Sequence, residues 1–271
     1  MSSPFVPGLA PAELPTGQVH IWLADPDLQD HARLEARHGH LLSAAERARH
    51  QAFRFARDRH LYLAAHALAR RALAHYTGIA PGEIGFAADA GGKPRAVLPP
   101  ACGDIAYNLS HTSGLVACVL GRDMACGVDV ELRRPLHDMM AMAATVFSAA
   151  EVTDLAACPP HARETCFFTL WTLREAYAKA TGEGILGDLS HLSFSLAGGG
   201  VDARFDASRA ARATQPHPAA QASHPTHAGD AARWRFHSQA YGERHLLAVA
   251  ALPSQPVPAA SIAFVQHCYP L

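Results

Sequence analysis

The order of predicted elements along this chain constrains its fold most, because the same order occurs twice. In each half, segments with helical spacing of apolar residues precede segments with the composition of strands. In the first half we expect a strand at Val19–Ala24, helices from Ser43 toward Phe55 and, with Asp58 as its candidate cap, at Arg59–Tyr76, and strands at Ile84–Ala87, Ile105–Leu109 and Leu115–Leu120. Ser43 with Glu46, and Ser148 with Glu151, have the spacing of capping boxes that begin helices. A strand at Cys126–Glu131 then begins the second half. In the second half we expect helices at Met139–Thr145, Ser148–Ala157 and Arg163–Ala180, then strands at Leu192–Leu196, Arg233–Gln239 and His245–Ala251. Two such sets predict an α+β fold of two similar subdomains.

The boundaries of the subdomains follow from this order and from local composition. We expect an N-terminal arm over 1–17, a first subdomain over 18–124, a second over 125–252 and a C-terminal tail over 253–271. A stretch at about 206–230 is biased toward alanine, histidine and proline and has neither a helix nor a strand period. Such composition predicts a mobile insertion within the second subdomain.

Composition excludes several classes of protein. The chain has 271 residues and a formal net charge of -1, which argues against a dedicated nucleic-acid binder. It has no apolar run of the roughly 18 residues that a membrane span needs, and its start lacks the pattern of a secretory signal. Six cysteines without a C-x-x-C spacing read as buried thiols rather than a zinc or disulfide framework, so we expect a cytoplasmic protein. His31, His38 and His40 invite a metal-site interpretation, but we favour positions on a surface helix.

A pair of carboxylates lies on the predicted strand GVDVE. Because side chains alternate along a strand, Asp129 and Glu131 share one face while Val128 and Val130 face the core. Neighbouring carboxylates repel each other unless a cation lies between them, and hard oxygen ligands suit Mg²⁺. A solvated acidic edge with arginine partners is the alternative interpretation.

A second cluster lies on the predicted helix 163–180, where Glu175 and Lys179 are one turn apart on the same face. A surface ion pair is the ordinary explanation of this spacing. However, the chain contains only two lysines, Lys93 and Lys179, and uses arginine elsewhere. A compact ammonium on a phosphate, or one able to lose its proton, cannot be replaced by a guanidinium.

Two shorter motifs accompany these clusters. Lys93 lies in GGKP, which does not have the spacing of a phosphate-binding P-loop and could be a simple turn. Ser110 and His111 lie at a predicted strand end, where they could donate to a phosphate or close a turn.

Taken together and in order, these segments resemble the 4′-phosphopantetheinyl transferases of the larger, Sfp-type branch. The resemblance covers about residues 45–195 and rests on FRFARDRHLYLAAHALAR (53–70), GGKP (91–94), YNLSHTSG (107–114), CGVDVE (126–131), FSAAE (147–151) and FFTLWTLREAYAKATGEGI (167–185). It implies an α+β fold whose two subdomains are related by a pseudo-twofold axis, with coenzyme A bound in the cleft between them. The implied enzyme is a monomer that moves the phosphopantetheine arm of coenzyme A to a serine of an acyl or peptidyl carrier protein and releases adenosine 3′,5′-bisphosphate.

The resemblance also implies roles for individual residues. Asp129, Glu131 and Glu175 would bind Mg²⁺, and Lys179 would contact the reacting phosphate. The remaining implied contacts are with the phosphates of coenzyme A: Ser110 and His111 at the 3′-phosphate, with Lys93 nearby and Arg57 as a further contact.

The chemistry of phosphoryl transfer explains these residue types, because catalysis there depends on positioning and on neutralising charge. A base must accept the serine proton, and the candidates are Glu175, directly or through a metal-bound water, and Lys179. Two other functions remain open from the residues alone: a non-catalytic protein that binds coenzyme A or a carrier on the same scaffold, and a Mg²⁺-dependent phosphate hydrolase.

Overall fold

The computed structural model of the chain describes residues 11–89, 92–183, 189–196, 200–206, 231–256, 258 and 262–271. Nearly all of the insertion expected at 206–230, and the first ten residues of the expected arm, lie outside the described residues. The elements of the first half are β1 (Gln18–Ala24), α1 (His31–His38), α2 (Ala44–Ala52), α3 (Ala56–Thr77), β2 (Gly85–Ala88), β3 (Pro94–Val97), β4 (Ile105–Thr112) and β5 (Leu115–Arg122). The later elements are β6 (Met124–Leu132), α4 (Met139–Val146), α5 (Ala149–Ala157), α6 (Pro160–Thr181), β7 (Leu192–Ser195), β8 (Asp202–Phe205), β9 (Arg235–Tyr241), β10 (His245–Pro253) and β11 (Ala263–Cys268).

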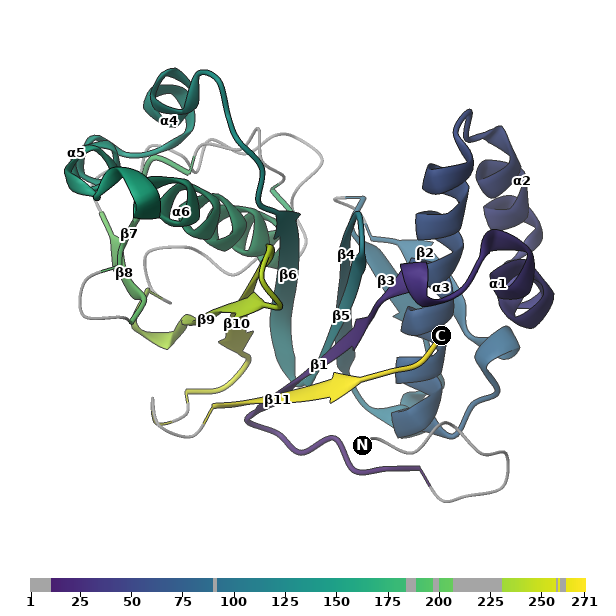
Figure 1. Cartoon of the computed structure of the whole chain (residues 1–271). Coiled ribbons are helices and arrows are strands. Elements are labelled where there is room, and N and C mark those ends of the chain that lie inside the picture. The colour runs from purple at the N-terminus through teal and green to yellow at the C-terminus, as the bar shows by residue number, and fades with distance from the viewer. Residues whose placement is uncertain are drawn as a thin grey trace.

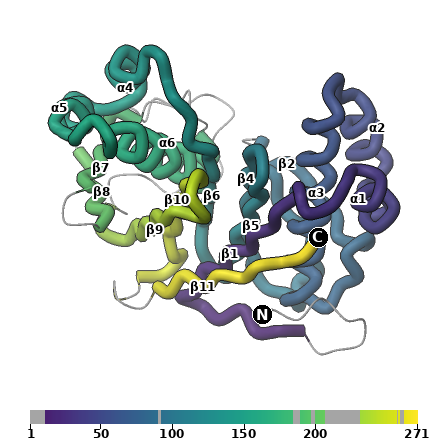
Figure 2. The backbone as a smooth tube through the Cα atoms, in the orientation of Figure 1, coloured from purple at the N-terminus to yellow at the C-terminus, as the bar shows by residue number. Residues whose placement is uncertain are grey.

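The main elements form four layers in the order helix, sheet, sheet, helix (Figures 1 and 2). One sheet has the strand order β11-β1-β5-β4 and packs against α3, whereas the other has the order β6-β10-β9 and packs against α6. Two small hairpins, β2-β3 and β7-β8, complete the described sheets. The architecture is therefore the predicted α+β fold of two related halves.

Strands between these layers are apolar on both faces. On β5, Leu115, Ala117 and Val119 contribute to the core between the two sheets, while Val116, Cys118 and Leu120 contribute to the core beneath α3. β10 alternates in the same way between the central core and the core beneath α6. Burial on both faces explains why these strands read as continuous apolar runs in the sequence.

The two halves repeat their helix starts as well as their layers. α2 begins with a capping box of Ser43 and Glu46, and α5 begins with the equivalent box of Ser148 and Glu151. In each box the serine side chain accepts from the backbone N–H three residues on, and the glutamate accepts from the serine N–H. α3 and α6 are both 22 residues long and both end at a left-handed glycine.

The structure differs from the sequence expectation in several places. β3 and β8 were not expected, and His38, which we expected on a surface helix, is buried. The region expected as a C-terminal tail contains β11, which pairs in parallel with β1 and so returns the chain to the first sheet (Figure 1). α3 starts at Ala56, with Phe55 rather than Asp58 as its N-cap. Only Cys118 and Cys126 are buried among the cysteines, and Cys268 is exposed.

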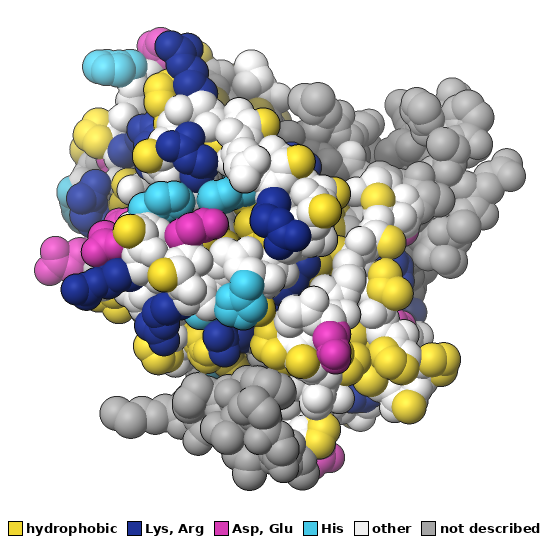
Figure 3. Space-filling view, turned by 90° about the vertical axis from the view of Figure 1, so that its right-hand side faces the viewer, with side chains coloured by type: hydrophobic (Ala, Val, Ile, Leu, Met, Phe, Trp, Pro, Cys, Tyr) yellow, Lys and Arg dark blue, Asp and Glu magenta, His cyan; other side chains and the backbone are white. Residues whose placement is uncertain are grey.

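Within the described residues, no helix has both the length and the apolar character that crossing a membrane would need. The face of the first half that carries α1 and α2 presents basic, acidic and histidine side chains close together (Figure 3). Charged and imidazole groups on this face contrast with the apolar layers behind it.

Candidate active site

The two sheets meet along a seam between strand β4 and strand β6. The strands belong to different sheets, and side chains of β4 accept hydrogen bonds from the backbone of β6. The Asn108 side-chain oxygen accepts from the Val128 N–H at 3.0 Å, and the Ser110 Oγ accepts from the Val130 N–H at 3.2 Å. Asn108 was not among the predicted site residues, since only the three-dimensional pairing of the two strands reveals its partner.

Ser110, Asp129 and Lys179 meet at this seam, although they are far apart in the sequence. The Ser110 hydroxyl donates to Asp129 Oδ1 at 2.9 Å, and the Lys179 ammonium donates to the same oxygen at 2.6 Å. Lys179 also donates to Ser110 Oγ at 3.0 Å. Asp129 is 4 % exposed, so this charge is held by its partners rather than by water.

Gly127 brings the backbone of α6 against β6. A Cβ atom at this position would lie 2.1 Å from the Ala176 carbonyl oxygen and 2.5 Å from the Ala180 nitrogen. Only a residue without a side chain permits this contact, and the contact sets how far Glu175 and Lys179 stand from Asp129.

Glu131 and Glu175 lie near enough to Asp129 for its negative charge to raise their pKa values. Burial raises the pKa of Glu131 and the Asp129 carboxylate raises it further, against the opposing effects of Arg134 and a hydrogen bond from Trp171. Burial and Asp129 also raise the pKa of Glu175, while Lys179 lowers it. A cation beside these carboxylates would favour the charged forms of Glu131 and Glu175.

One carboxylate oxygen at the site has an unsatisfied hydrogen-bonding capacity. Asp129 Oδ2 is buried and has no hydrogen-bond partner among the described residues. The three carboxylates do not form a compact ligand set in this structure, since no choice of one oxygen from each places all three within 4.8 Å of one another. The site nevertheless supplies carboxylate oxygens of the kind that a hard cation binds, and Lys179 contacts only one of the two oxygens of Asp129.

Comparison with known proteins matches both halves of the chain. A family model described as 4′-phosphopantetheinyl transferase, N-terminal matches residues 33–121, and one described as 4′-phosphopantetheinyl transferase superfamily matches residues 125–250. The 4′-phosphopantetheinyl transferase HetI of Nostoc is 34% identical over 173 residues, which are 62% of this chain and 70% of HetI. The chain belongs to the 4′-phosphopantetheinyl transferase family. This confirms the family that the motifs resemble and the transferase activity that they imply.

Two relatives from Bacillus extend the comparison. The 4′-phosphopantetheinyl transferase psf-1 of Bacillus pumilus is 32% identical over 57% of this chain and 64% of its own length. The 4′-phosphopantetheinyl transferase of Bacillus subtilis is 30% identical over 57% of this chain and 66% of its own length. The chain thus matches slightly less than two thirds of each of these relatives. Membership implies coenzyme A and a carrier protein as substrates, and the family typically uses Mg²⁺.

Beside the seam, the transferase has a cleft of about 950 Å³ in its first half. His111 lines this cleft, and desolvation, Lys179 and His66 lower its pKa. Arg49 and Arg70 add positive charge to the lining. Arg70 forms an ion pair with Glu46 at 2.6 Å, a group that the sequence indicated only as a helix cap.

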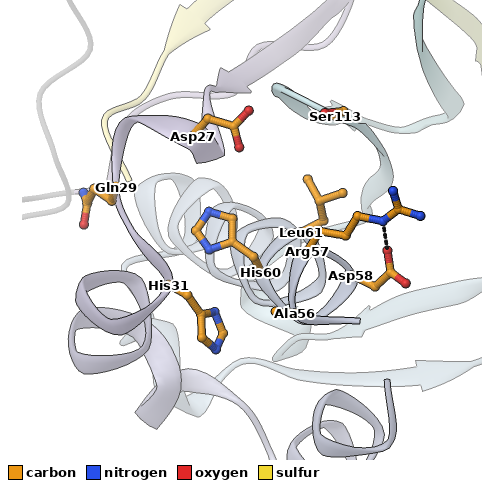
Figure 4. Close-up of a pocket in the computed structure, with 9 residues that line it drawn as sticks. All are labelled: Asp27, Gln29, His31, Ala56, Arg57, Asp58, His60, Leu61 and Ser113. Carbon is orange, nitrogen blue, oxygen red and sulfur yellow. Dashed lines mark ion pairs between the residues drawn. The ribbon is translucent and has the colours of Figure 1, made fainter. Parts of the chain in front are cut away.

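Lys93 and Arg57 lie apart from the Ser110, Asp129 and Lys179 cluster of the transferase. The Lys93 ammonium donates to the carbonyl oxygens of Ala180 at 2.7 Å and Cys126 at 3.3 Å, and burial lowers its pKa. Arg57 is largely exposed, lies 3.4 Å from Asp58 and lines a different cavity of about 520 Å³ (Figure 4). Of the predicted contacts, Lys93 therefore binds the protein's own backbone in this structure.

Proposed function

We propose that this chain transfers the 4′-phosphopantetheine arm of coenzyme A to a serine hydroxyl of an apo carrier protein, at the seam between β4, β6 and α6. The observation that carries the proposal is the buried contact of Ser110 and Lys179 with Asp129, beside Glu131 and Glu175. This contact places carboxylates that can bind a cation beside a lysine and a serine that can bind phosphate. Both halves of the chain are needed, because the serine is on β4 and the other residues are on β6 and α6.

Asp129, Glu131 and Glu175 are the residues that would hold Mg²⁺. The unpartnered Asp129 Oδ2 and the mutual destabilisation of charge among the carboxylates support this assignment. When bound, the ion would neutralise the diphosphate of coenzyme A and favour departure of the bisphosphate.

Lys179 would orient the phosphate that is attacked. Its side chain is 29% exposed, and its ammonium donates to Asp129 and Ser110, so one of its three donors can turn toward a ligand while the others keep these contacts. For the proton of the carrier serine, Glu175, directly or through a metal-bound water, is our first candidate acceptor, because it lies one turn from Lys179 on the same face of α6. Lys179 remains the second.

The nucleotide part of coenzyme A would occupy the cleft lined by His111 in the first half. Ser110 and His111 adjoin the seam, which supports their contact with the 3′-phosphate, and Arg49 in the lining is a further cation. We infer that Lys93 is a positioning residue that fixes the end of α6. Because Arg57 is largely exposed and lines a different cavity, we infer that it contacts a phosphate of coenzyme A only where that phosphate reaches the protein surface.

The test is incubation of the protein with coenzyme A, Mg²⁺ and several apo carrier proteins, followed by weighing the carriers by mass spectrometry. We expect the mass of one phosphopantetheine on at least one carrier, and its loss in Glu175→Gln with the circular dichroism spectrum unchanged. Binding of coenzyme A without any modified carrier would favour the non-catalytic alternative. Phosphate release without a carrier would favour the hydrolase. We further propose a monomer that acts in the cytoplasm, which sedimentation and fractionation would test.

A further inference from the structure

Three histidines and a glutamate gather where α1, α2 and α3 meet, away from the seam. His31 and Glu35 are one turn apart on α1 and so share a face of that helix. His50 lies near the end of α2, and His60 lies in the second turn of α3. Sequence spacing groups His31 with His38 and His40 rather than with these partners, because the cluster spans three helices.

The ligand atoms of this cluster converge. One ring nitrogen from each of His31 and His50 and one carboxylate oxygen of Glu35 all lie within 4.8 Å of one another. Within the part of the chain that the structure describes, no other three histidine, cysteine, aspartate or glutamate residues meet this condition. The His31 and His50 rings are stacked with centroids 5.9 Å apart.

Several nitrogens in this cluster are buried and unsatisfied. His31 Nδ1, His50 Nε2 and His60 Nδ1 are buried atoms with no hydrogen-bond partner. His50 is only 6 % exposed, and the Glu35 oxygen nearest its Nε2 is 3.8 Å away, too far for a hydrogen bond. Each unsatisfied buried group costs about 1–3 kcal/mol, so three together in a folded protein indicate a ligand or ordered water between them.

The third ring is oriented as a metal-binding histidine commonly is. His60 Nε2 lies 2.7 Å from the carbonyl oxygen of Pro26, so this nitrogen carries the proton and donates. Nδ1 is then left with a free lone pair, the tautomer that such an outer carbonyl contact selects in metal sites. The His60 centroid is 5.8 Å from that of His31, and the two rings lie near each other in Figure 4.

We propose that His31, Glu35 and His50 bind a divalent transition-metal ion of the Zn²⁺ class, with His60 as the adjacent candidate for a fourth ligand. Two imidazoles and one carboxylate suit Zn²⁺, which takes nitrogen and oxygen donors at about 2.0–2.2 Å. Mg²⁺ prefers oxygen donors alone, so donor chemistry separates this site from the carboxylates at the seam. The Glu35 side chain is 45% exposed and can turn onto the ion, which would then join α1 to α2.

The experiment measures Zn²⁺ binding to the full chain by calorimetry, in the presence of excess Mg²⁺. We compare wild type with Glu35→Gln and His50→Gln, and use His40→Gln as the control because His40 is an exposed histidine in the same region. We expect both ligand variants to lose one equivalent of Zn²⁺, or to bind it more than about tenfold more weakly, while the control binds as wild type does. Zn²⁺ should also raise the melting temperature of wild type and control but not of Glu35→Gln.

Glu35→Gln keeps every histidine and cysteine of wild type, and the two histidine variants each lack one histidine, so the difference between them and the control reports on this cluster. His50→Gln replaces a buried side chain and can unfold the protein, but Glu35→Gln alters an exposed one and keeps the proposal testable. Equal stoichiometry and affinity in wild type and Glu35→Gln would overturn it. Displacement of the Zn²⁺ equivalent by millimolar Mg²⁺ would also overturn it.

Discussion

Replacing Gly127 by alanine tests whether the packing of α6 on β6 sets the geometry of the active site. A Cβ atom at this position would lie 2.1 Å from the Ala176 carbonyl oxygen, and real contacts of this kind are essentially never shorter than 3.0 Å. The helix and the strand must therefore separate by about 0.9 Å, because the atoms in conflict belong to the backbone and cannot rotate away.

The separation acts directly on the cluster of Ser110, Asp129 and Lys179 that we propose as the active site. Asp129 is on β6, whereas Lys179 is on α6, and their contact is 2.6 Å long. A displacement near 1 Å stretches it beyond hydrogen-bonding distance and moves Glu175 with the helix. Misplacement of this size can cost about 100-fold in rate, and overpacking costs typically about 1–3 kcal/mol in stability. We expect both effects in Gly127→Ala.

The assay is kcat/KM for modification of a carrier protein, together with urea unfolding of the same preparation. Gly200→Ala is the matched control, since it also adds a methyl group but meets no described atom within 4 Å. A Gly127→Ala protein that keeps its rate within about threefold, while Gly200→Ala behaves as wild type, would show that helix position does not limit catalysis.

Three further predictions concern charged side chains. Lys179→Arg should lower carrier modification more than about tenfold with little change in melting temperature, because a guanidinium is larger and cannot give up its proton; near-normal turnover would make Lys179 an ordinary cation. Glu151→Gln should cost about 3–5 kcal/mol in urea unfolding, since Arg174 is buried against this fully buried carboxylate; a loss below about 1 kcal/mol would contradict that. Burial alone would raise the pKa of Glu46, but hydrogen bonds from His66 and Ser43 and the charge of Arg70 hold it well below 4.5. Glu46→Gln should therefore be less stable than wild type at pH 7, and the difference should shrink as the pH falls below about 4.5 and vanish below the folded pKa; a gap that is constant with pH would refute this.

The periodicity of the sequence was enough to predict which side chains share a face of a single strand or helix at the proposed site. Alternation along β6 correctly separates Val128 and Val130, which are in the central core, from Asp129. Helical spacing correctly puts Glu175 and Lys179 on one face of α6, and the capping boxes correctly mark the starts of α2 and α5. These features are set by neighbours within a few residues, which is the range over which sequence patterns carry structural information.

Contacts between distant segments could not be predicted in this way. The pair formed by Glu175 and Lys179 suggested an ion pair along the helix, but the ammonium reaches Asp129 on another element, 50 residues away. β11 joins the first sheet although it starts 239 positions after the end of β1, and nothing in its composition specifies that partner. The cluster of His31, Glu35 and His50 likewise depends on how α1 packs against α2.

The repeat of the fold also explains why the described residues form one site of carboxylates and lysine, at the seam, rather than one in each half. α3 and α6 are equally long, and in each the buried arginine of the pair, Arg70 or Arg174, binds the glutamate of a capping box. Aligning these arginines puts Arg71 opposite Glu175 and His75 opposite Lys179. α3 thus has neither a carboxylate nor an ammonium at the positions equivalent to Glu175 and Lys179. The first half contributes the cleft lined by His111 instead.

The two lysines act on the same turn of the second helix. Lys179 extends from that turn to Asp129, and Lys93, on a loop of the first half, donates to the carbonyl oxygen of Ala180, the next residue. A compact ammonium can reach this carbonyl and that of Cys126 on β6 together, so Lys93 joins the end of α6 to the strand that carries Asp129. A planar guanidinium has its donors fixed in one fork and would need the loop to move. In an arginine-rich chain, both lysines therefore lie where the donor must be small, Lys179 at Asp129 in the proposed active site and Lys93 behind it.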